Sequence, residues 1–173
     1  QSKAILIFDG NCPREFLDFV KKEAKKEIFT KYFIPANFLK LAEFHNDAKY
    51  FKGFNLFLNL REANVLIGSK SINNSIDASK AIFKKTKTET NLIIVTDGPN
   101  VACGVSKKQI ARVKPNVIQE NVSRLGAGDA LFSYFLSYKE LNPDASLKES
   151  LSAANGKTHQ FLKNQWLKNF WIK

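Results

Sequence analysis

The chain has 173 residues, a formal net charge of +11, 44% hydrophobic residues and 25% charged residues. This composition is typical of a folded globular domain and excludes a disordered chain, and no apolar run approaches the roughly 20 residues that a membrane-spanning helix needs. The excess of basic residues predicts a solvated surface that favours anionic ligands; no basic run resembles a nucleic-acid-binding module, so nucleic acid is not an expected partner.

Strand and helix signals alternate through the first part of the chain. Residues 4–8 form an apolar run that predicts a strand buried on both faces, and Pro13 is placed to open a helix. Residues 27–33 predict a second strand, which Pro35 ends. The apolar positions of the intervening helix recur at helical spacing and are Phe16, Leu17, Val20 and Ala24.

The alternation continues through the middle of the chain. Asn37 is expected to cap a short helix, residues 55–60 predict a third strand, and residues 61–67 predict a helical turn that Gly68 ends. A longer helix is expected over residues 75–85. Its inward-facing positions are predicted to be Ile76, Ala81 and Ile82.

The last part of the chain adds a buried strand and a pair of short strands that are expected to be antiparallel. Residues 91–96 predict a fourth buried strand closed by a strong turn signal, and residues 101–105 and 109–113 predict a short antiparallel pair. A final amphipathic helix is expected over residues 147–163. Because strands and helices alternate, we expect a mostly parallel sheet with helices on both faces, forming one domain over residues 1–173.

The glycine-rich stretch GAGD, residues 126–129, directly precedes an apolar helical run. In an α/β sheet, a helix that begins beyond the carboxyl ends of the strands points unpaired N–H groups at a ligand, and glycines let a phosphate approach the backbone. Gly126, Ala127 and Gly128 are therefore a candidate anion hole. Asp129 would lie beside the phosphate and take a proton from an attacking hydroxyl. The alternative is a glycine-rich helix start that an aspartate caps.

The stretch GAGDALFSYFL resembles the C-terminal signature of the ribokinase-like sugar kinases, the PfkB family, and three further stretches agree in order. Asn59 and Glu62, in NLRE, match the N-x-x-E motif that this family places near magnesium and phosphates. Thr96 and Gly98 match its T-x-G motif at a strand end facing the nucleotide. SAANGKTHQFL, with Asn155, resembles the late helix beside the adenine.

The resemblance implies a ribokinase-like fold of three α/β/α layers, with ATP and Mg²⁺ as cofactors and a small sugar or nucleoside as substrate. It implies that Asp129 is the catalytic base for phosphoryl transfer to a ribose 5′-hydroxyl. Within the family, LIFDGNCPREFLDFV, IFTKYFIPANFLKL and FLNLREANVL are most similar to stretches of the pseudouridine kinases.

The sequence departs from the family pattern in two ways. Ser123, Arg124 and Leu125 stand where a threonine-rich triplet usually precedes GAGD, and Arg124 either contacts phosphate instead or faces solvent. The N-terminal half that carries the sugar-binding glycines and the lid strands has no counterpart before residue 4. We therefore expect the ATP-side portion of a kinase, with an exposed sheet edge that promotes self-association.

Two alternatives to a kinase stay open. One is a non-catalytic, truncated PfkB paralogue that binds nucleotide; the other, motivated by charge alone, is a nucleic-acid-associated protein. Cys12 and Cys103 lie far apart and are expected to be free thiols, which fits a reducing, cytoplasmic location. His45 and His159 have no evident partner in the sequence and are expected to be surface or helix-flank residues.

Overall fold

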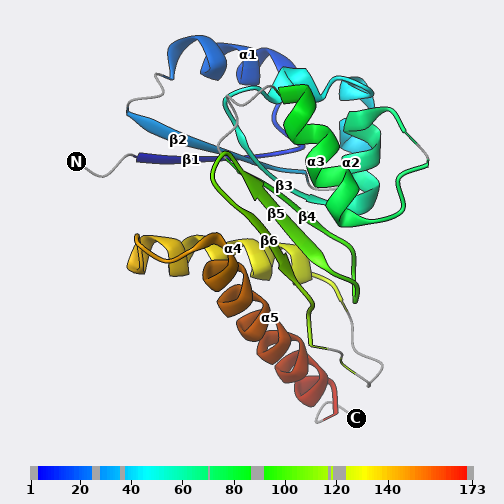
Figure 1. The fold of residues 1–173 in the computed structure, drawn as a ribbon, viewed down its shortest axis with the longest axis vertical. Helices are drawn as coiled ribbons and strands as arrows, with labels where there is room; N and C mark the ends of the chain where they lie inside the picture. The colour runs from blue at the N-terminus through cyan, green and yellow to red at the C-terminus, as the bar shows by residue number, and fades with distance from the viewer. Residues whose placement is uncertain are drawn as a thin grey trace.

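The computed structural model describes residues 4–24, 28–35, 38–69, 71–86, 92–116, 118 and 124–170, with side chains described as far as residue 164. Within these ranges one sheet holds six strands in the spatial order of the sequence (Figure 1). The strands are β1 (Ala4–Asp9), β2 (Phe29–Ile34), β3 (Asn55–Asn59), β4 (Leu92–Thr96), β5 (Ala102–Ser106) and β6 (Ile110–Val113).

The helices and 3₁₀ turns connect these strands and follow the last one. They are α1 (Arg14–Glu23), η1 (Phe38–Phe44), η2 (Ala48–Phe51), α2 (Leu60–Ile67), α3 (Ser75–Thr86), α4 (Ala127–Leu141) and α5 (Leu147–Phe170). In Figure 1, α1, α2 and α3 lie on one face of the sheet and α4 and α5 on the other. The predicted three-layer, ribokinase-like α/β architecture is confirmed.

The sheet is parallel from β1 to β4 and antiparallel from β4 to β6, as the sequence predicts. Parallel strands need a crossover connection, which α1 supplies between β1 and β2 and α2 with α3 supply between β3 and β4. Because β1 to β4 run the same way, their carboxyl ends lie at one edge of the sheet. At that edge Asn59 and Thr96 are register partners.

Two hydrophobic cores fill the two faces of the sheet, and successive strand residues enter them alternately. On β3, Leu56 and Leu58 belong to the core under α1, α2 and α3, whereas Phe57 belongs to the core under α4 and α5. On β4, Ile94 likewise points to the α4 and α5 side. Phe57 is 4% exposed and Ile94 is fully buried, which explains why these strands read as continuous apolar runs.

The prediction that the first strand is buried on both faces is wrong. β1 lies at one edge of the sheet and pairs only with β2 among the described strands, so Phe8 is its one buried residue. Ile7 is 52% exposed, and Phe16, which was expected to face inward from α1, is 48% exposed. Among the described residues, the sheet edge at β1 is therefore unpaired and carries exposed apolar side chains.

Smaller differences concern element boundaries. β2 begins at Phe29 and ends at Ile34, one or two residues later than the predicted 27–33. In α3, Ile82 is buried as predicted, but Ala78 is the second buried aliphatic residue and Ile76 is only half-buried. The predicted cap Asn37 lies outside the described residues, and α5 continues to Phe170, beyond the predicted end at 163.

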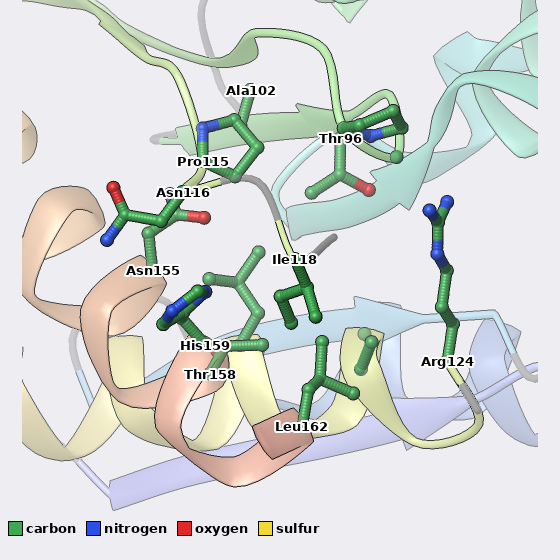
Figure 2. A pocket seen from close by; sticks show the side chains of 15 residues that line it. Thr96, Ala102, Pro115, Asn116, Ile118, Arg124, Asn155, Thr158, His159 and Leu162 are labelled. Carbon is green, nitrogen blue, oxygen red and sulfur yellow. The ribbon is translucent and has the colours of Figure 1, made fainter. Parts of the chain in front are cut away.

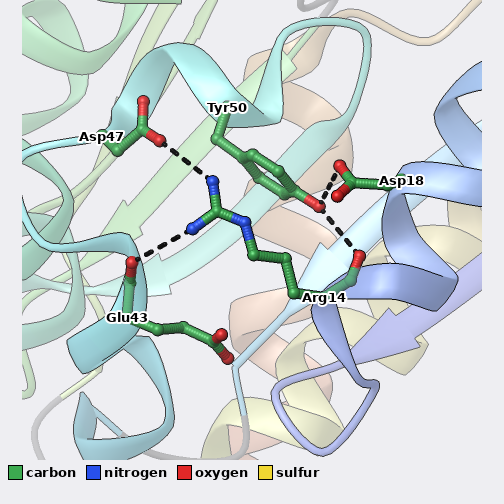
Figure 3. A network of polar contacts seen from close by, with 5 residues as sticks. All are labelled: Arg14, Asp18, Glu43, Asp47 and Tyr50. Atoms are coloured by element: carbon green, nitrogen blue, oxygen red, sulfur yellow. Dashed lines mark hydrogen bonds and ion pairs between the residues drawn. The ribbon is translucent and has the colours of Figure 1, made fainter.

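A polar network joins α1 to the 3₁₀ turns (Figure 3). The Tyr50 hydroxyl lies 2.9 Å from Asp18 Oδ1 and 3.2 Å from the Arg14 carbonyl oxygen. The Arg14 guanidinium donates to the Glu43 carbonyl oxygen at 3.5 Å and pairs with Asp47 at 3.7 Å. The guanidinium also lies over the Tyr50 ring, 4.7 Å from its centroid. These contacts fix α1 against the turns that precede β3.

Among the described residues, no helix combines the length and the apolar composition needed to cross a lipid bilayer.

Candidate nucleotide site at the carboxyl ends of the strands

The start of α4 has the geometry of an anion-binding helix end. Gly126 is its N-cap residue with φ of 74°, a left-handed conformation that glycine adopts without strain, and no side chain of a described residue caps the helix. The Ala127 N–H donates to the Arg124 carbonyl oxygen at 3.1 Å. The N–H groups of Gly128 and Asp129 are those that a helix leaves unpaired in its first turn.

The space beside the Cα atom of Gly128 is open. A Cβ built on this residue would meet no atom within 4 Å, so packing within the protein does not require glycine here. Gly98, which follows β4, has φ of 54°, and a Cβ on it would approach Arg124 Nη1 at 3.9 Å. A ligand can therefore reach the backbone closely at both glycines.

A cavity of about 170 Å³ brings together most of the predicted nucleotide-binding residues (Figure 2). Thr96 and Gly98 line it from the end of β4, Ala127 and Gly128 from the start of α4, and Asn155 from α5. Ligand pockets commonly measure roughly 300–1,000 Å³, so the cavity that the described residues enclose is smaller than a typical ligand pocket.

The two ends of the cavity differ in chemistry. Figure 2 shows Arg124 on one side, whereas Asn116, Asn155 and His159 lie on the other. The other residues that line the cavity are largely apolar and include Pro99, Ala102, Pro115, Ile118, Leu131 and Leu162. An arginine near a helix N-terminus suits phosphate groups, and an apolar slot with amide and imidazole groups suits a flat heterocycle.

Asn59 and Glu62 form a reciprocal capping box at the start of α2. Glu62 N donates to Asn59 Oδ1 at 3.0 Å, and Asn59 N donates to Glu62 Oε2 at 2.8 Å. Glu62 is 5% exposed. Burial raises the pKa of its carboxyl to about 7, the charge of Asp129 acts in the same direction, and the hydrogen bonds with Asn59 oppose both.

The predicted site residues therefore fall into two groups. Thr96, Gly98, Ala127, Gly128 and Asn155 share the cavity. The other group, which does not line the cavity, is Asn59, Glu62, Gly126 and Asp129. The exposed carboxyl of Asp129 lies close enough to Glu62 for its charge to act on it, so α4 connects the two groups.

His159 is the main residue that sequence reasoning missed. It was expected to be a surface or helix-flank residue without a binding role, but it is half-buried and lines the cavity one helical turn after Asn155. The spacing of four residues on a predicted helix was the available signal, because residues i and i+4 share a helix face. Arg124, for which a phosphate contact and a solvent-facing position were both open, is exposed and also lines the cavity.

The sheet, its two helical layers and the glycine-rich start of α4 define a ribokinase-like α/β fold. The model of the pfkB family carbohydrate kinases matches residues 22–157, and the chain belongs to this family. Among curated proteins, none matches the sequence.

Solved structures with the same fold are kinases of low sequence identity. Adenosine kinase from Sinorhizobium meliloti matches with a TM-score of 0.68 at 17% identity, over 92% of this chain and 49% of that chain. A mutant of phosphofructokinase-2 from Escherichia coli matches with a TM-score of 0.73 at 20% identity, over 95% of this chain and 53% of that chain. Adenosine kinase from Schistosoma mansoni in complex with 2-fluoroadenosine matches with a TM-score of 0.67 at 18% identity, over 91% of this chain and 50% of that chain. The chain thus spans about half the length of these structures, and none of the three is a pseudouridine kinase.

Proposed function

We propose that this chain is the nucleotide-binding portion of a kinase that transfers the γ-phosphoryl group of ATP to a hydroxyl of a small sugar or nucleoside. One observation carries the proposal: the first turn of α4, at Ala127 and Gly128, and the glycine turn after β4 line one cavity. This is the edge where α/β sheets bind ligands.

The polarity of the cavity supports one orientation of ATP. The phosphates lie toward Arg124 and Gly128, where the helix dipole and the guanidinium both favour negative charge. The adenine lies in the apolar slot beside Asn155, flanked by Pro115 and Leu162. Family membership and the kinase neighbours support the proposal that the chain is part of a kinase, and the orientation of ATP is proposed from the cavity alone.

In this proposal Asp129 is the general base. Its carboxyl is exposed on the first turn of α4, so a substrate hydroxyl can reach it. It takes the proton as the hydroxyl oxygen attacks the terminal phosphorus and the bond to the ADP oxygen breaks. The Gly128 and Asp129 N–H groups stabilise the charge on the transferred group.

The residues present fit a magnesium ion held mainly by nucleotide and water. Among the described residues, no group of three or more His, Cys, Asp and Glu side chains could hold a metal; Mg²⁺ is commonly bound through one or two carboxylates plus phosphates and water. Glu62 is such a carboxylate, and only its Oε2 atom is used in the capping box. With Asn59 it would hold the ion, which neutralises charge on the phosphates when bound.

The acceptor is proposed from sequence resemblance alone. We propose a pseudouridine-like nucleoside, against ribose, adenosine and fructose phosphate as alternatives. The test is to incubate the full-length gene product with MgATP and each acceptor, measuring ADP and the phosphorylated product. Phosphorylation of pseudouridine supports the proposal, and ATP binding without any transfer would contradict the kinase assignment. We expect the 173-residue chain alone to bind MgATP but to transfer phosphate weakly or not at all, because it spans about half of the kinases it resembles.

A second candidate is a nucleotide-binding paralogue without catalysis. Leu125 favours this second candidate, because it stands where the family pattern has a threonine before the anion hole. Its side chain is 84% exposed. Phosphoryl transfer that depends on Asp129 would exclude this candidate.

For either function we propose a cytoplasmic location, which the free thiols of Cys12 and Cys103 support.

A further inference from the structure

A larger cavity lies at the other edge of the sheet, where the parallel strands begin. Its volume is about 440 Å³, within the roughly 300–1,000 Å³ that ligand pockets commonly measure. Thr30, Asn55 and Leu92 line it from the amino ends of β2, β3 and β4, and Lys139 lines it from the last turn of α4. Gly128, at the nucleotide cavity, and Lys139 lie about 17 Å apart along the axis of α4, so the two cavities are separate.

The side chain of Asn55 is buried at this cavity with an unpaired polar atom. Asn55 is 5% exposed, and its Oδ1 atom has no hydrogen-bond partner among the described residues. Because strand side chains alternate between the faces of a sheet, Asn55 shares the α4 and α5 face with Phe57, opposite to Leu56. Its amide therefore lies on the side of the sheet that the cavity occupies. Buried polar atoms are nearly always paired, so this one indicates a partner from outside the chain.

The charged side chains that line the cavity are all basic. The described lining residues include Lys107, Lys108 and Lys139 and no Asp or Glu. Lys107 and Lys108 are exposed on the turn between β5 and β6. Lys139 is half-buried, and its Nζ atom donates to the carbonyl oxygens of Pro143, at 3.1 Å, and Ala145. An ammonium group has three donors, so Lys139 has one left for a ligand.

The neutral residues at the cavity suit an anion that has an apolar body. Leu92, Phe135 and Leu147 supply apolar surface. Tyr32 also lines the cavity; burial raises the pKa of its hydroxyl to about 12, and the charge of Glu140 acts in the same direction. The hydroxyl therefore stays protonated at neutral pH and is a hydrogen-bond donor.

We propose that this cavity is a second ligand site, which binds a small organic anion. The phosphate or carboxylate group of the ligand lies toward the lysines, its apolar body lies against α4 and β4, and it completes the hydrogen bonding of Asn55. The proposal does not depend on the proposed function, because the described residues that line the two cavities are different.

The experiment measures the affinity of the full chain for three probes by calorimetry, with and without MgATP. Phenyl phosphate and phenylacetate carry the two kinds of anionic group on an apolar ring, and benzyl alcohol has a similar ring without a charge. At least one anion should bind at millimolar concentration and more tightly than benzyl alcohol, and the tighter of the two identifies the group that the site prefers. MgATP should leave this affinity unchanged.

Three variants locate the bound probe. Lys107→Gln combined with Lys108→Gln should weaken binding of the anion by about 2- to 30-fold, the effect of two partly exposed charge contacts. Lys22→Gln combined with Lys49→Gln removes the same charge from exposed positions on α1 and η2 and should leave the affinity unchanged. Asn55→Leu should weaken binding by about 2- to 10-fold without lowering the free energy of unfolding of the unbound chain, because it removes a buried amide that lacks a partner.

Each contrary result identifies what is wrong. The proposal is overturned if neither anion binds, or if benzyl alcohol binds as tightly as the anions. An equal loss in the two double lysine variants would show an effect of overall charge, and displacement by MgATP would place the probe in the nucleotide cavity; either result overturns the second site. An Asn55→Leu variant that loses stability but keeps its affinity would contradict the role of Asn55.

Discussion

Asn59 and Glu62 each accept a hydrogen bond from the backbone N–H of the other, at 3.0 and 2.8 Å. These two hydrogen bonds cap the start of α2 directly after the carboxyl end of β3. They hold the buried Glu62 carboxylate close to the start of α4. The residues predicted as magnesium ligands are thus also helix caps. A capping role alone does not require the carboxyl to be buried beside a second acidic residue, since burial of a charge costs free energy.

Replacement of Glu62 by glutamine should change how stability depends on pH. The folded-state pKa of Glu62 is about 7, above its ordinary value of 4.5, so its contribution to stability is fully present below pH 4.5 and is lost as pH rises through 7. The loss is on the order of 3 kcal/mol. Glu62→Gln keeps a capping side chain but cannot ionise, so its free energy of unfolding relative to wild type should rise between pH 4.5 and 7.

Urea unfolding across this pH range checks the prediction, and Glu149→Gln is the matched control. Glu149 forms the same kind of capping box with Ser146 but is exposed. Hydrogen bonds with Ser146 lower its pKa, so this variant should lose relative stability above the ordinary pKa. Parallel pH profiles for wild type and Glu62→Gln would contradict the burial of an ionisable carboxylate at this position.

Gly128→Ala should separate folding from ligand binding. A Cβ here meets no atom within 4 Å, and alanine is favoured over glycine in helices, so the variant should be more stable by about 0.5–1 kcal/mol. The methyl group would occupy the space over the unpaired N–H groups and weaken tripolyphosphate and MgATP binding. Gly156→Ala, in α5 and equally open, should gain stability without losing affinity. Equal affinity in both variants would show that phosphate does not approach Gly128.

Tyr50→Phe should cost stability without affecting nucleotide binding. The variant loses the contact of the hydroxyl with Asp18 at 2.9 Å, worth about 1 kcal/mol, in a network that lies on α1 and the 3₁₀ turns rather than at the cavity. Thermal unfolding and calorimetry with MgATP measure the two effects. A loss of MgATP affinity in a folded variant would link this network to the site and contradict the separation described above.

The apolar edge at β1 predicts self-association, which we propose on the basis of its exposed side chains. Ile7 on β1 is 52% exposed, Phe19 on helix α1 is 59% exposed, and β1 pairs only with β2 among the described strands. Ile7→Lys should increase the monomer fraction, because charged residues on edge strands disfavour pairing. Ile110→Lys, on the opposite edge strand β6 and 54% exposed, is the control. A wild-type chain that stays monomeric in light scattering at high concentration would refute the prediction.

The sequence predicts what depends on local pattern and misses what depends on neighbours in space. The buried runs in β3 and β4 and the glycine-rich start of α4 were read correctly, because a strand buried on both faces and a helix N-terminus have local signatures. The exposure of Ile7 was missed because an apolar run does not say whether its strand lies at the centre or the edge of a sheet.

The sequence also did not predict which distant segments contact each other. His159 reaches the cavity because α5 packs against α4 and β6. Its four-residue spacing from Asn155 indicates a shared helix face but does not indicate which elements that face packs against. The N-x-x-E spacing of Asn59 and Glu62 is compatible with both a capping box and a metal site. The structure establishes the capping box, and the metal role stays a prediction.

The central claim, that the start of α4 positions a catalytic base beside a bound phosphate, is tested most directly by Asp129→Asn in the full-length gene product. The account predicts that the rate of phosphoryl transfer from MgATP falls by about 10²- to 10⁴-fold, while the dissociation constant for MgATP stays within a few-fold of wild type. Unchanged turnover in a folded Asp129→Asn variant would contradict the claim.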